Sequence, residues 1–439
     1  MYIVSTKTQN ATKNKVITSS KNVTPFGGLN LIYNAINRSG IPEFLDNKIG
    51  FRHFRAKYSY SDIVLSLFGN SVCQGDYISD LKQFKSKFSD QLFANIPSAD
   101  TVEYACQELK TTTIKEVTNK GIVHEINFNN DLNNSIVALC IKTKQLDPMV
   151  KNYTLDFDNV VVETQKQDSK KSYKKTNGYH PNFAFIGRLP VHIENHNGNT
   201  PAKYKQSETL KRCFDNLDSN KVRIGHFRAD SASYQQSVVE LVSQRATCFY
   251  IRNVNSESFR KHCALIKTWE TIEVNFEKKE VATTNYTPFG GDKSYRIVVT
   301  RSLRNDQQID MLSGCSYTYY GIMTNNIAYS NKQIIEFYND RGDAENSNRY
   351  LLNDFNVHHL PFPEMDMNTV FMYLMAMCCV LFEWTKKILV QNKTRYIKLN
   401  MRVKAICFNY INIASTFVNH ARQRTLQIFS EQDYKILQI

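Results

Sequence analysis

The sequence lacks several features that mark familiar classes of protein. Its ten cysteines are scattered and none forms a Cys-x2-Cys pair, which argues against a structural zinc site. Met1–Asn10 has no apolar segment of the kind found in a signal peptide, so we expect free thiols in a reducing cytoplasm. The longest apolar run, Val370–Phe382, is too short to span a bilayer. We therefore expect a buried core helix there and no membrane partner.

Acidic residues are missing from both ends of the chain, although the formal net charge of the whole chain is +14 and its pI is near 9.1. Residues 1–38 and 386–424 contain basic residues and no acid. These basic residues are Lys7, Lys13, Lys15, Lys21, Arg38, Lys386, Lys387, Lys393, Arg395, Lys398, Arg402, Lys404, Arg422 and Arg424. Ordinary protein surfaces mix both signs, so we interpret both ends as regions that face phosphates. The charge predicts a polyanionic partner such as DNA.

What is present is the composition of a folded protein, with 42% hydrophobic and 12% aromatic residues. A chain of 439 residues is too long for one compact core. Its first third is predicted to be helical over Tyr60–Phe68, after Pro97 with Asp100 as the cap, and over Ser135–Thr143. Short helices in a basic region fit a helix-turn-helix reader of DNA, and they fit a plain helical bundle equally well.

The pattern changes at Tyr153 to short β-rich segments separated by Gly, Asn and Pro. A helix is expected from Ser231, and a second β-rich block follows it. A long helix is predicted to begin near Asn331, and the chain after Pro363 reads as helical again. The sequence therefore predicts a mixed α/β protein flanked by helices.

Three acidic positions stand where chemistry is plausible. Asp156 and Asp158 share one face of a predicted strand, because side chains alternate along a strand. That face could equally be a solvated one. Asp230 follows a predicted strand over 222–229, where functional groups collect in α/β sheets, although an Asp here could simply cap the next helix.

The third acidic position, Glu345, lies at helical spacing with Tyr338 and Arg341 on an otherwise apolar stripe. A surface salt bridge between Arg341 and Glu345 is the alternative explanation. Three such acids can hold two divalent cations that activate water and stabilise the leaving oxygen in phosphodiester cleavage. Hard oxygen ligands suit Mg²⁺.

These motifs together resemble the DDE transposases of bacterial insertion sequences. Tyr338, Arg341 and Glu345 match the first three positions of the helical signature Tyr-x2-Arg-x3-Glu-x6-Lys that defines one superfamily. Other segments are similar to the insertion-sequence group numbered thirteen-eighty. These segments are Thr154–Asp158, Tyr173–Lys175, Gly178–Pro181 and Phe227–Ser231.

The resemblance implies an RNase H-like catalytic domain with a β-rich insertion between the second Asp and the Glu. Asp158, Asp230 and Glu345 would be the catalytic residues and the ligands of Mg²⁺, which Mn²⁺ can replace. Asp156 is the rival for the first position. Tyr338 and Arg341 would contact phosphates near the transposon end.

The expected domain order follows from the resemblance and the element pattern. It is a helical DNA-binding region over 1–150, an RNase H-like catalytic domain over 151–245 and 329–382, a β-rich insertion over 246–328, and a basic helical region over 383–439.

Two departures from the family pattern affect its details. The final Lys position of the signature holds Leu352, so Arg349 is the candidate for that phosphate contact. Asn159 and Val160 replace the small residue and Thr that commonly follow the first Asp.

A basic loop over 166–175 is a further candidate for contact with the DNA backbone. Its cations are Lys170, Lys171, Lys174 and Lys175, with Tyr173 among them. A flexible, solvated loop would have the same composition.

Three functions remain in competition. The first is an active transposase that binds double-stranded DNA, both transposon ends and target, as a homodimer in the synaptic complex. It would act in the bacterial cytoplasm, at the nucleoid. The second is a non-cleaving DNA-binding protein descended from a transposase. The third is a metal-dependent nuclease that does not rejoin DNA.

Overall fold

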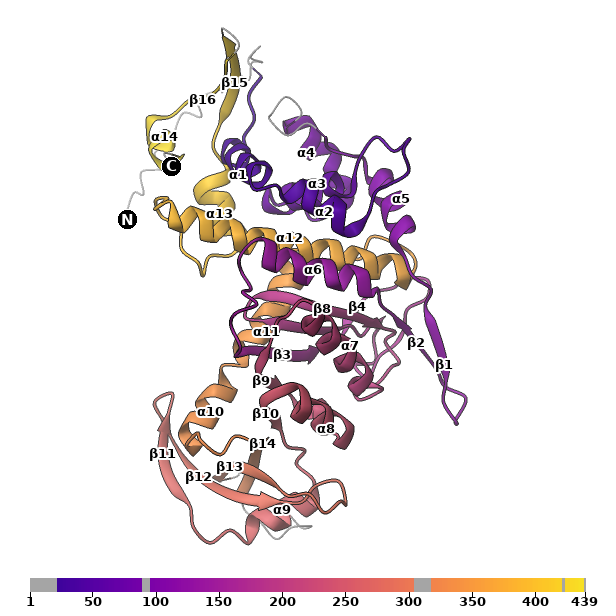
Figure 1. Cartoon of the computed structure of the whole chain (residues 1–439), viewed down its shortest axis with the longest axis vertical. Coiled ribbons are helices and arrows are strands. Elements are labelled where there is room, and N and C mark those ends of the chain that lie inside the picture. Colours follow the sequence, from indigo (N-terminus) through magenta and orange to yellow (C-terminus); the bar gives the residue numbers. More distant parts are fainter. Residues whose placement is uncertain (1–21, 89–94, 304–316, 421–422, 438–439) are drawn as a thin grey trace, which may run out of the picture.

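The computed structural model describes residues 22–88, 95–303, 317–420 and 423–437. A layer of helices forms one end of the molecule and rests on the long helix α12, Met365–Gln391 (Figure 1). The helices of this layer are α1 Gly27–Arg38, α2 Ile41–Ile49, α3 Tyr60–Val72, η1 Ile78–Asp80, α4 Leu81–Phe88 and α5 Ala99–Leu109.

Side-chain caps set the starts of two of these helices. Ser59 accepts a hydrogen bond from the backbone of Asp62, whose carboxylate returns one to Ser59, so α3 begins with a capping box. Ser98 accepts from the backbone of Thr101 and caps α5. The prediction of Asp100 as the cap is therefore wrong. Asp100 lies in the first turn, where its charge favours the positive end of the helix dipole.

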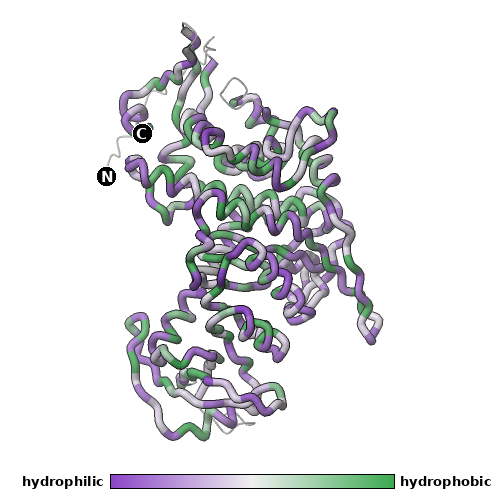
Figure 2. Tube along the Cα trace, in the orientation of Figure 1, coloured by the Kyte–Doolittle hydropathy of each residue, from purple (hydrophilic) through white to green (hydrophobic). Residues whose placement is uncertain are grey.

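Helix α12 is the central core element, as the apolar run predicted. It packs on α3, α5 and α6, Asn130–Lys142, and on strand β8, Leu189–His196. By length and composition α12 could cross a membrane, but 94% of its most apolar window is buried inside the protein. Figure 2 shows hydrophobic residues along this helix between the upper helices and the sheet.

An eleven-stranded sheet runs from β1 to β11 in the order β1-β2-β8-β7-β3-β9-β10-β14-β13-β12-β11. Strands β7 and β8 are antiparallel to their neighbours, and β9 and β10 run parallel to β3. The remaining bounds are β1 Ile114–Val117, β2 Val123–Asn127, β3 Tyr153–Asn159, β7 Asn182–Ile186, β9 Ile224–Ala229, β10 Ala246–Arg252, β11 Glu270–Val274, β12 Glu277–Tyr286, β13 Tyr295–Leu303 and β14 Tyr317–Thr324.

The β-rich segment over 246–328 is continuous with the rest of the sheet. Strand β10 pairs with β9 on one side and with β14 on the other. Helix α9, Glu257–Ala264, accompanies β11–β14, and α7, Gln206–Ser219, and α8, Gln236–Arg245, lie in the connections around β9. The helix expected at Ser231 begins as a short turn, η2 Ser231–Ser233, before α8. A separate small sheet contains β4 Val162–Glu163, β5 Lys170–Lys171 and β6 Asn177–Tyr179.

The long helix predicted from Asn331 is divided in two. Helix α10, Asn331–Asn339, packs on β11–β14, with Ile334 and Ile335 in a core shared with Val281 and Val298. Helix α11, Gly342–Arg349, packs instead on β3 and β7 and continues into a π-helical turn, η3 Tyr350–Asp354. The division lets one segment cover two parts of the sheet.

The C-terminal region is not wholly helical, which corrects the prediction for 383–439. After α13, Val403–Ile406, and η4, Cys407–Ile411, come two antiparallel strands and then α14, Glu431–Leu437. The strands are β15 Ser415–His420 and β16 Gln423–Ile428. Thr416 and Val418 are β-branched residues that favour a strand, and Ser415 also pairs with Thr24. The described cysteines carry free thiols.

Candidate active site

The site is built where β3 and β9 end side by side. The parallel register places Asp156 opposite Arg228 and Phe157 opposite Ala229, so Asp158 and Asp230 stand at the same level. The Asp230 carboxylate accepts a hydrogen bond of 2.9 Å from the backbone N–H of Ala232. Asp230 therefore caps η2, which was one of its two predicted roles, and also stands at the edge that holds Asp158.

Asp156, the rival for the first metal ligand, lies in a buried ion pair. Its two carboxylate oxygens accept hydrogen bonds of 2.7 and 2.8 Å from Nε and Nη2 of Arg228. The third nitrogen of that guanidinium donates to the carbonyl of Phe337 in α10 at 2.6 Å. Asp156 and Arg228 are 3% and 7% exposed, so the pair is shielded from solvent.

Asp158 is more accessible than Asp156 and faces α11. Its Oδ1 lies 2.9 Å from Nη2 of Arg341, and its Oδ2 accepts from Nδ2 of Asn348 at 2.8 Å. The sequence predicted Arg341 on a helix, with Glu345 as its alternative ion-pair partner. Arg341 instead lies in the turn between α10 and α11, and the partner shown for it is Asp158. Asn348 was missed, although its position one turn before Leu352 falls within the signature segment.

The pKa of Tyr338 is shifted by the charged groups that share this site. Its hydroxyl donates to the carbonyl of Ala229 at 3.2 Å. Burial raises the pKa of Tyr338 to about 12; the charge of Arg341 lowers it, and that of Asp230 raises it. Smaller influences come from Arg252 and Asp158.

Glu345 belongs to α11, but its side chain lies outside the described residues. Its place in the helix is four residues after Arg341 and three before Asn348, the spacing at which residues share a helical face. Both of those residues contact Asp158. Helix α11 thus brings the segment that contains Glu345 to the edge formed by Asp158 and Asp230.

Arg252 is a site residue that the sequence reasoning missed. It ends β10, and the pairing of Ile251 with Ala229 places it level with Asp230. Its guanidinium lies 5.0 Å from the ring centroid of Tyr320, which is 48% exposed. The sequence signal was only that of a basic residue at the end of a predicted strand.

Among the described residues, the other predicted DNA contacts do not pair with Asp158 or Asp230. Lys170 forms an ion pair of 2.8 Å with Glu125. Lys171, Lys174 and Lys175 are exposed beside it, and Arg349 is exposed in the last turn of α11. Lys171, Lys174, Lys175 and Arg349 therefore retain the accessibility that contact with a phosphate requires.

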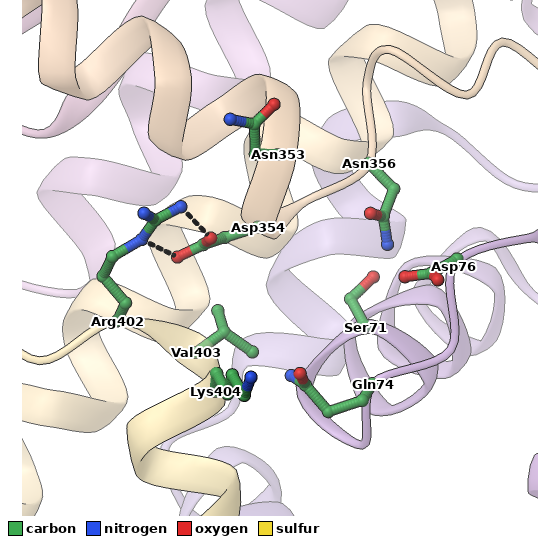
Figure 3. Close-up of a pocket in the computed structure, with 9 residues that line it drawn as sticks. All are labelled: Ser71, Gln74, Asp76, Asn353, Asp354, Asn356, Arg402, Val403 and Lys404. Carbon is green, nitrogen blue, oxygen red and sulfur yellow. Dashed lines mark hydrogen bonds and ion pairs between the residues drawn. The ribbon is translucent and has the colours of Figure 1, made fainter.

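Some basic residues near the C-terminus have acidic partners within the protein. The ammonium of Lys386 is fully buried and lies 2.7 Å from Glu383. Arg402 donates to Asp354 beside a cavity of about 280 Å³, which is drawn in Figure 3 and does not include Asp158 or Asp230. The interpretation of the whole segment as facing phosphates is therefore wrong for Lys386. Lys7, Lys13, Lys15, Lys21 and Arg422 lie outside the described residues.

The two described carboxylates at this edge fit a hard divalent cation. Asp158 and Asp230 supply carboxylate oxygens, which are the ligands that Mg²⁺ prefers in proteins. Within the described residues there is no group of three His, Cys, Asp or Glu side chains that could hold a metal ion. The side chain of Glu345 is not among the described residues, so this statement does not cover its carboxylate.

Fold and site together define a mixed α/β protein with aspartates at the carboxyl ends of adjacent parallel strands and arginines beside them. The family model described as "Transposase DDE domain group 1" matches residues 7–437. The chain therefore belongs to the DDE transposase family.

Comparisons beyond the family model are distant. No curated protein sequence matches the chain. A solved structure that it resembles is the piggyBac transposase synaptic complex with hairpin DNA, determined by cryo-EM. The identity is 11% and the TM-score 0.40, with 88% of this chain and 79% of that chain covered. This likeness is too weak to bear on function.

Proposed function

We propose that this protein is a DNA transposase that binds the terminal inverted repeats of its insertion sequence and catalyses two-metal phosphodiester cleavage and strand transfer. The observation that carries the proposal is the alignment of Asp158 and Asp230 on adjacent parallel strands, with α11 packed over the same edge through Arg341 and Asn348. Membership of the DDE transposase family supports it independently.

The central strands are consistent with an RNase H-like catalytic core. Three antiparallel strands, β8, β7 and β3, are followed by β9 and β10, which run parallel to β3. The acids then stand at the carboxyl ends of β3 and β9, the edge at which α/β sheets commonly bind ligands. We assign β11–β14 to the insertion and residues 22–150 to a region that contacts DNA.

Asp158, Asp230 and Glu345 would hold Mg²⁺, which Mn²⁺ can replace. When bound, such cations activate the attacking water and neutralise the leaving oxygen. Arg341 neutralises Asp158 and is placed to contact a phosphate that approaches this carboxylate. Tyr338 and Arg252 flank the same edge and would position the phosphate backbone. Arg349 would take the place of the missing signature Lys.

The test is Mg²⁺-dependent cleavage of a labelled duplex that carries the DNA flanking the coding region. Asp158→Asn, Asp230→Asn and Glu345→Gln remove one ligand charge each with little change in shape. We expect each to reduce cleavage more than about a hundredfold, since loss of even outer-shell partners of metal ligands has effects of 10–100-fold. Binding of the duplex should persist.

Asp340→Asn is the matched control, because Asp340 is exposed and ends the neighbouring helix. It should cleave like the wild type. Asp156→Ala is unsuitable as a control, because it leaves Arg228 buried without its partner. Equal activity in the three site variants and the control would refute the assignment of the acids.

The same assay distinguishes the alternatives. A non-cleaving descendant of a transposase would bind the duplex without cutting it in either Mg²⁺ or Mn²⁺. A metal-dependent nuclease would cut but would not join the released 3′-OH to a target duplex. We further propose a homodimer in the synaptic complex, which sedimentation of the protein with and without the duplex would detect.

A further inference from the structure

The loop Gly50–Ser59 between α2 and α3, here called the basic aromatic loop, displays two phenylalanines to solvent. Phe51 is 79% exposed and Phe54 is 83% exposed. Burial of such rings is favourable in water, so exposed phenylalanines on one short loop commonly mark a binding surface. The proposed catalytic function does not use this loop.

Hydrogen bonds from Arg52 hold the loop in a defined shape. Arg52 points inward, with a side chain only 7% exposed, and its Nε and Nη2 donate to Glu108 of α5 at 2.7 and 2.9 Å. Its Nη1 donates to the carbonyl of Tyr58 at 3.1 Å, which ties the two ends of the loop together. Tyr60 donates to the same Glu108 at 3.0 Å. The outward position of the two phenylalanines is thus a consequence of a defined clamp.

Cations accompany the exposed rings. The guanidinium of Arg55 lies 5.3 Å from the ring centroid of Phe54, and the ammonium of Lys57 lies 5.5 Å from that of Tyr58. Both Arg55 and Lys57 are exposed. Between Asp46 and Asp62 the sequence contains four Lys and Arg residues and no acid.

The neighbouring helices are less suited to contact DNA. Helix α3 is buried from Tyr60 to Val72 except at the half-buried Asp62, so it cannot enter a groove. Helix α5 exposes Glu103 and Tyr104 on its outer side. Exposed aromatic rings and the exposed cations Arg55 and Lys57 therefore coincide in the basic aromatic loop.

We propose that the basic aromatic loop binds duplex DNA, with Arg55 and Lys57 on the phosphate backbone and Phe51 and Phe54 against the sugars and bases. The inference rests on the proposed function and names a surface for its DNA partner. Phenylalanines that contact unstacked base steps beside cations on phosphates are a general mode of DNA binding. A second copy of the chain is a poorer fit, because it has the same net charge of +14 and would bring like charges together.

The test measures duplex affinity of the full chain by fluorescence anisotropy over a series of salt concentrations. One probe carries the DNA flanking the coding region, and the other is an unrelated duplex of equal length. In the charge variant, Arg55→Gln with Lys57→Gln, the slope of log K against log salt should fall in magnitude by about 1.8 on both probes, since each phosphate contact contributes about 0.9.

In the aromatic variant, Phe51→Ser with Phe54→Ser, affinity should fall about tenfold or more while the salt slope stays unchanged. Phe276→Ser is the matched aromatic control, because Phe276 is 98% exposed elsewhere. Lys261→Gln is the charge control, because Lys261 pairs with Glu257. Both controls should bind within twofold of the wild type.

Wild-type affinity and slope in both loop variants would overturn the inference and leave the proposed function standing. A change in the oligomeric state of the aromatic variant, with DNA affinity retained, would overturn it and assign the loop to self-association. Failure of the wild type to bind either duplex would refute the proposed function as well.

Discussion

Two aspartates that lie two residues apart on β3 have different partners, and the partners determine what each can do. Asp156 faces Arg228 on the adjacent strand, and the guanidinium occupies both of its oxygens. Asp158 is nearer the strand end, where α11 supplies Arg341 and Asn348. A buried carboxylate paired in this way has a structural role, whereas an accessible one at a strand end can exchange its partners.

Removal of one member of the Asp156–Arg228 pair should be more damaging than removal of both. Arg228→Met leaves the Asp156 charge buried, and we expect a loss of about 3–5 kcal/mol in the free energy of unfolding. The double variant Asp156→Leu with Arg228→Met should recover most of this loss, because apolar replacements of a buried pair are often neutral. Urea denaturation of the single and double variants provides the measurement. A double variant no more stable than Arg228→Met would contradict this account.

At the scale of elements, helix boundaries depend on which polar side chain reaches the free backbone N–H groups. Ser98 and Asp100 are both residue types that cap helices. The structure selects Ser98, since its extended backbone lets the hydroxyl accept from Thr101. The break between α10 and α11 near Asp340 similarly separates a part that packs on β11–β14 from a part that packs on β3.

Ser98→Ala should therefore destabilise the first turn of α5 by about 1 kcal/mol, the usual effect of losing a cap. Asp100→Ala should have a smaller effect, because only its interaction with the helix dipole is lost. Hydrogen exchange at the Thr101 amide measures the difference. Faster exchange in Asp100→Ala than in Ser98→Ala would show that the cap is assigned wrongly.

The sequence was sufficient for features that depend on local pattern. The apolar run predicted the core helix α12. The β-rich segment from Tyr153 and the strand over 222–229 predicted β3 and β9 within a few positions. Features that depend on distant partners were not predictable. The pairing of Asp156 with Arg228 and of Lys386 with carbonyl groups in the following loop depends on tertiary packing. The hairpin β15–β16 likewise pairs through Ser415 with Thr24, which lies near the other end of the chain.

At the scale of the whole molecule, stability should depend on pH through a buried cluster on β8. Burial raises the pKa of Glu194, but hydrogen bonds and charges from His196 and Arg212 outweigh it and lower the pKa to about 2. Burial lowers the pKa of His192 to about 4. Neither ring nitrogen of His192 has a hydrogen-bond partner among the described residues. Both groups bind protons more weakly in the folded state than in the unfolded state.

Stability should accordingly fall as the pH decreases from about 6.5 towards 4, because the unfolded chain gains a proton at His192 that the folded chain excludes. A further loss should follow between about 4.5 and 2 as Glu194 is protonated. His192→Phe should reduce the first loss, as shown by urea midpoints at pH 7 and pH 5. An unchanged difference between the two midpoints would mean that His192 does not contribute.

The continuity of the sheet constrains how β11–β14 are oriented relative to β3. Adjacent strands are rotated by about 20–25° on average, and four such steps separate β3 from β13, so the rotation between them amounts to about 80–100°. We therefore expect the sheet to be strongly twisted between the Asp158 edge and β13. The twist of the hydrogen-bonded strands sets the angle between the Asp158 edge and β11–β14, because paired strands join these two regions. A change in that angle would require the strands themselves to wind or unwind.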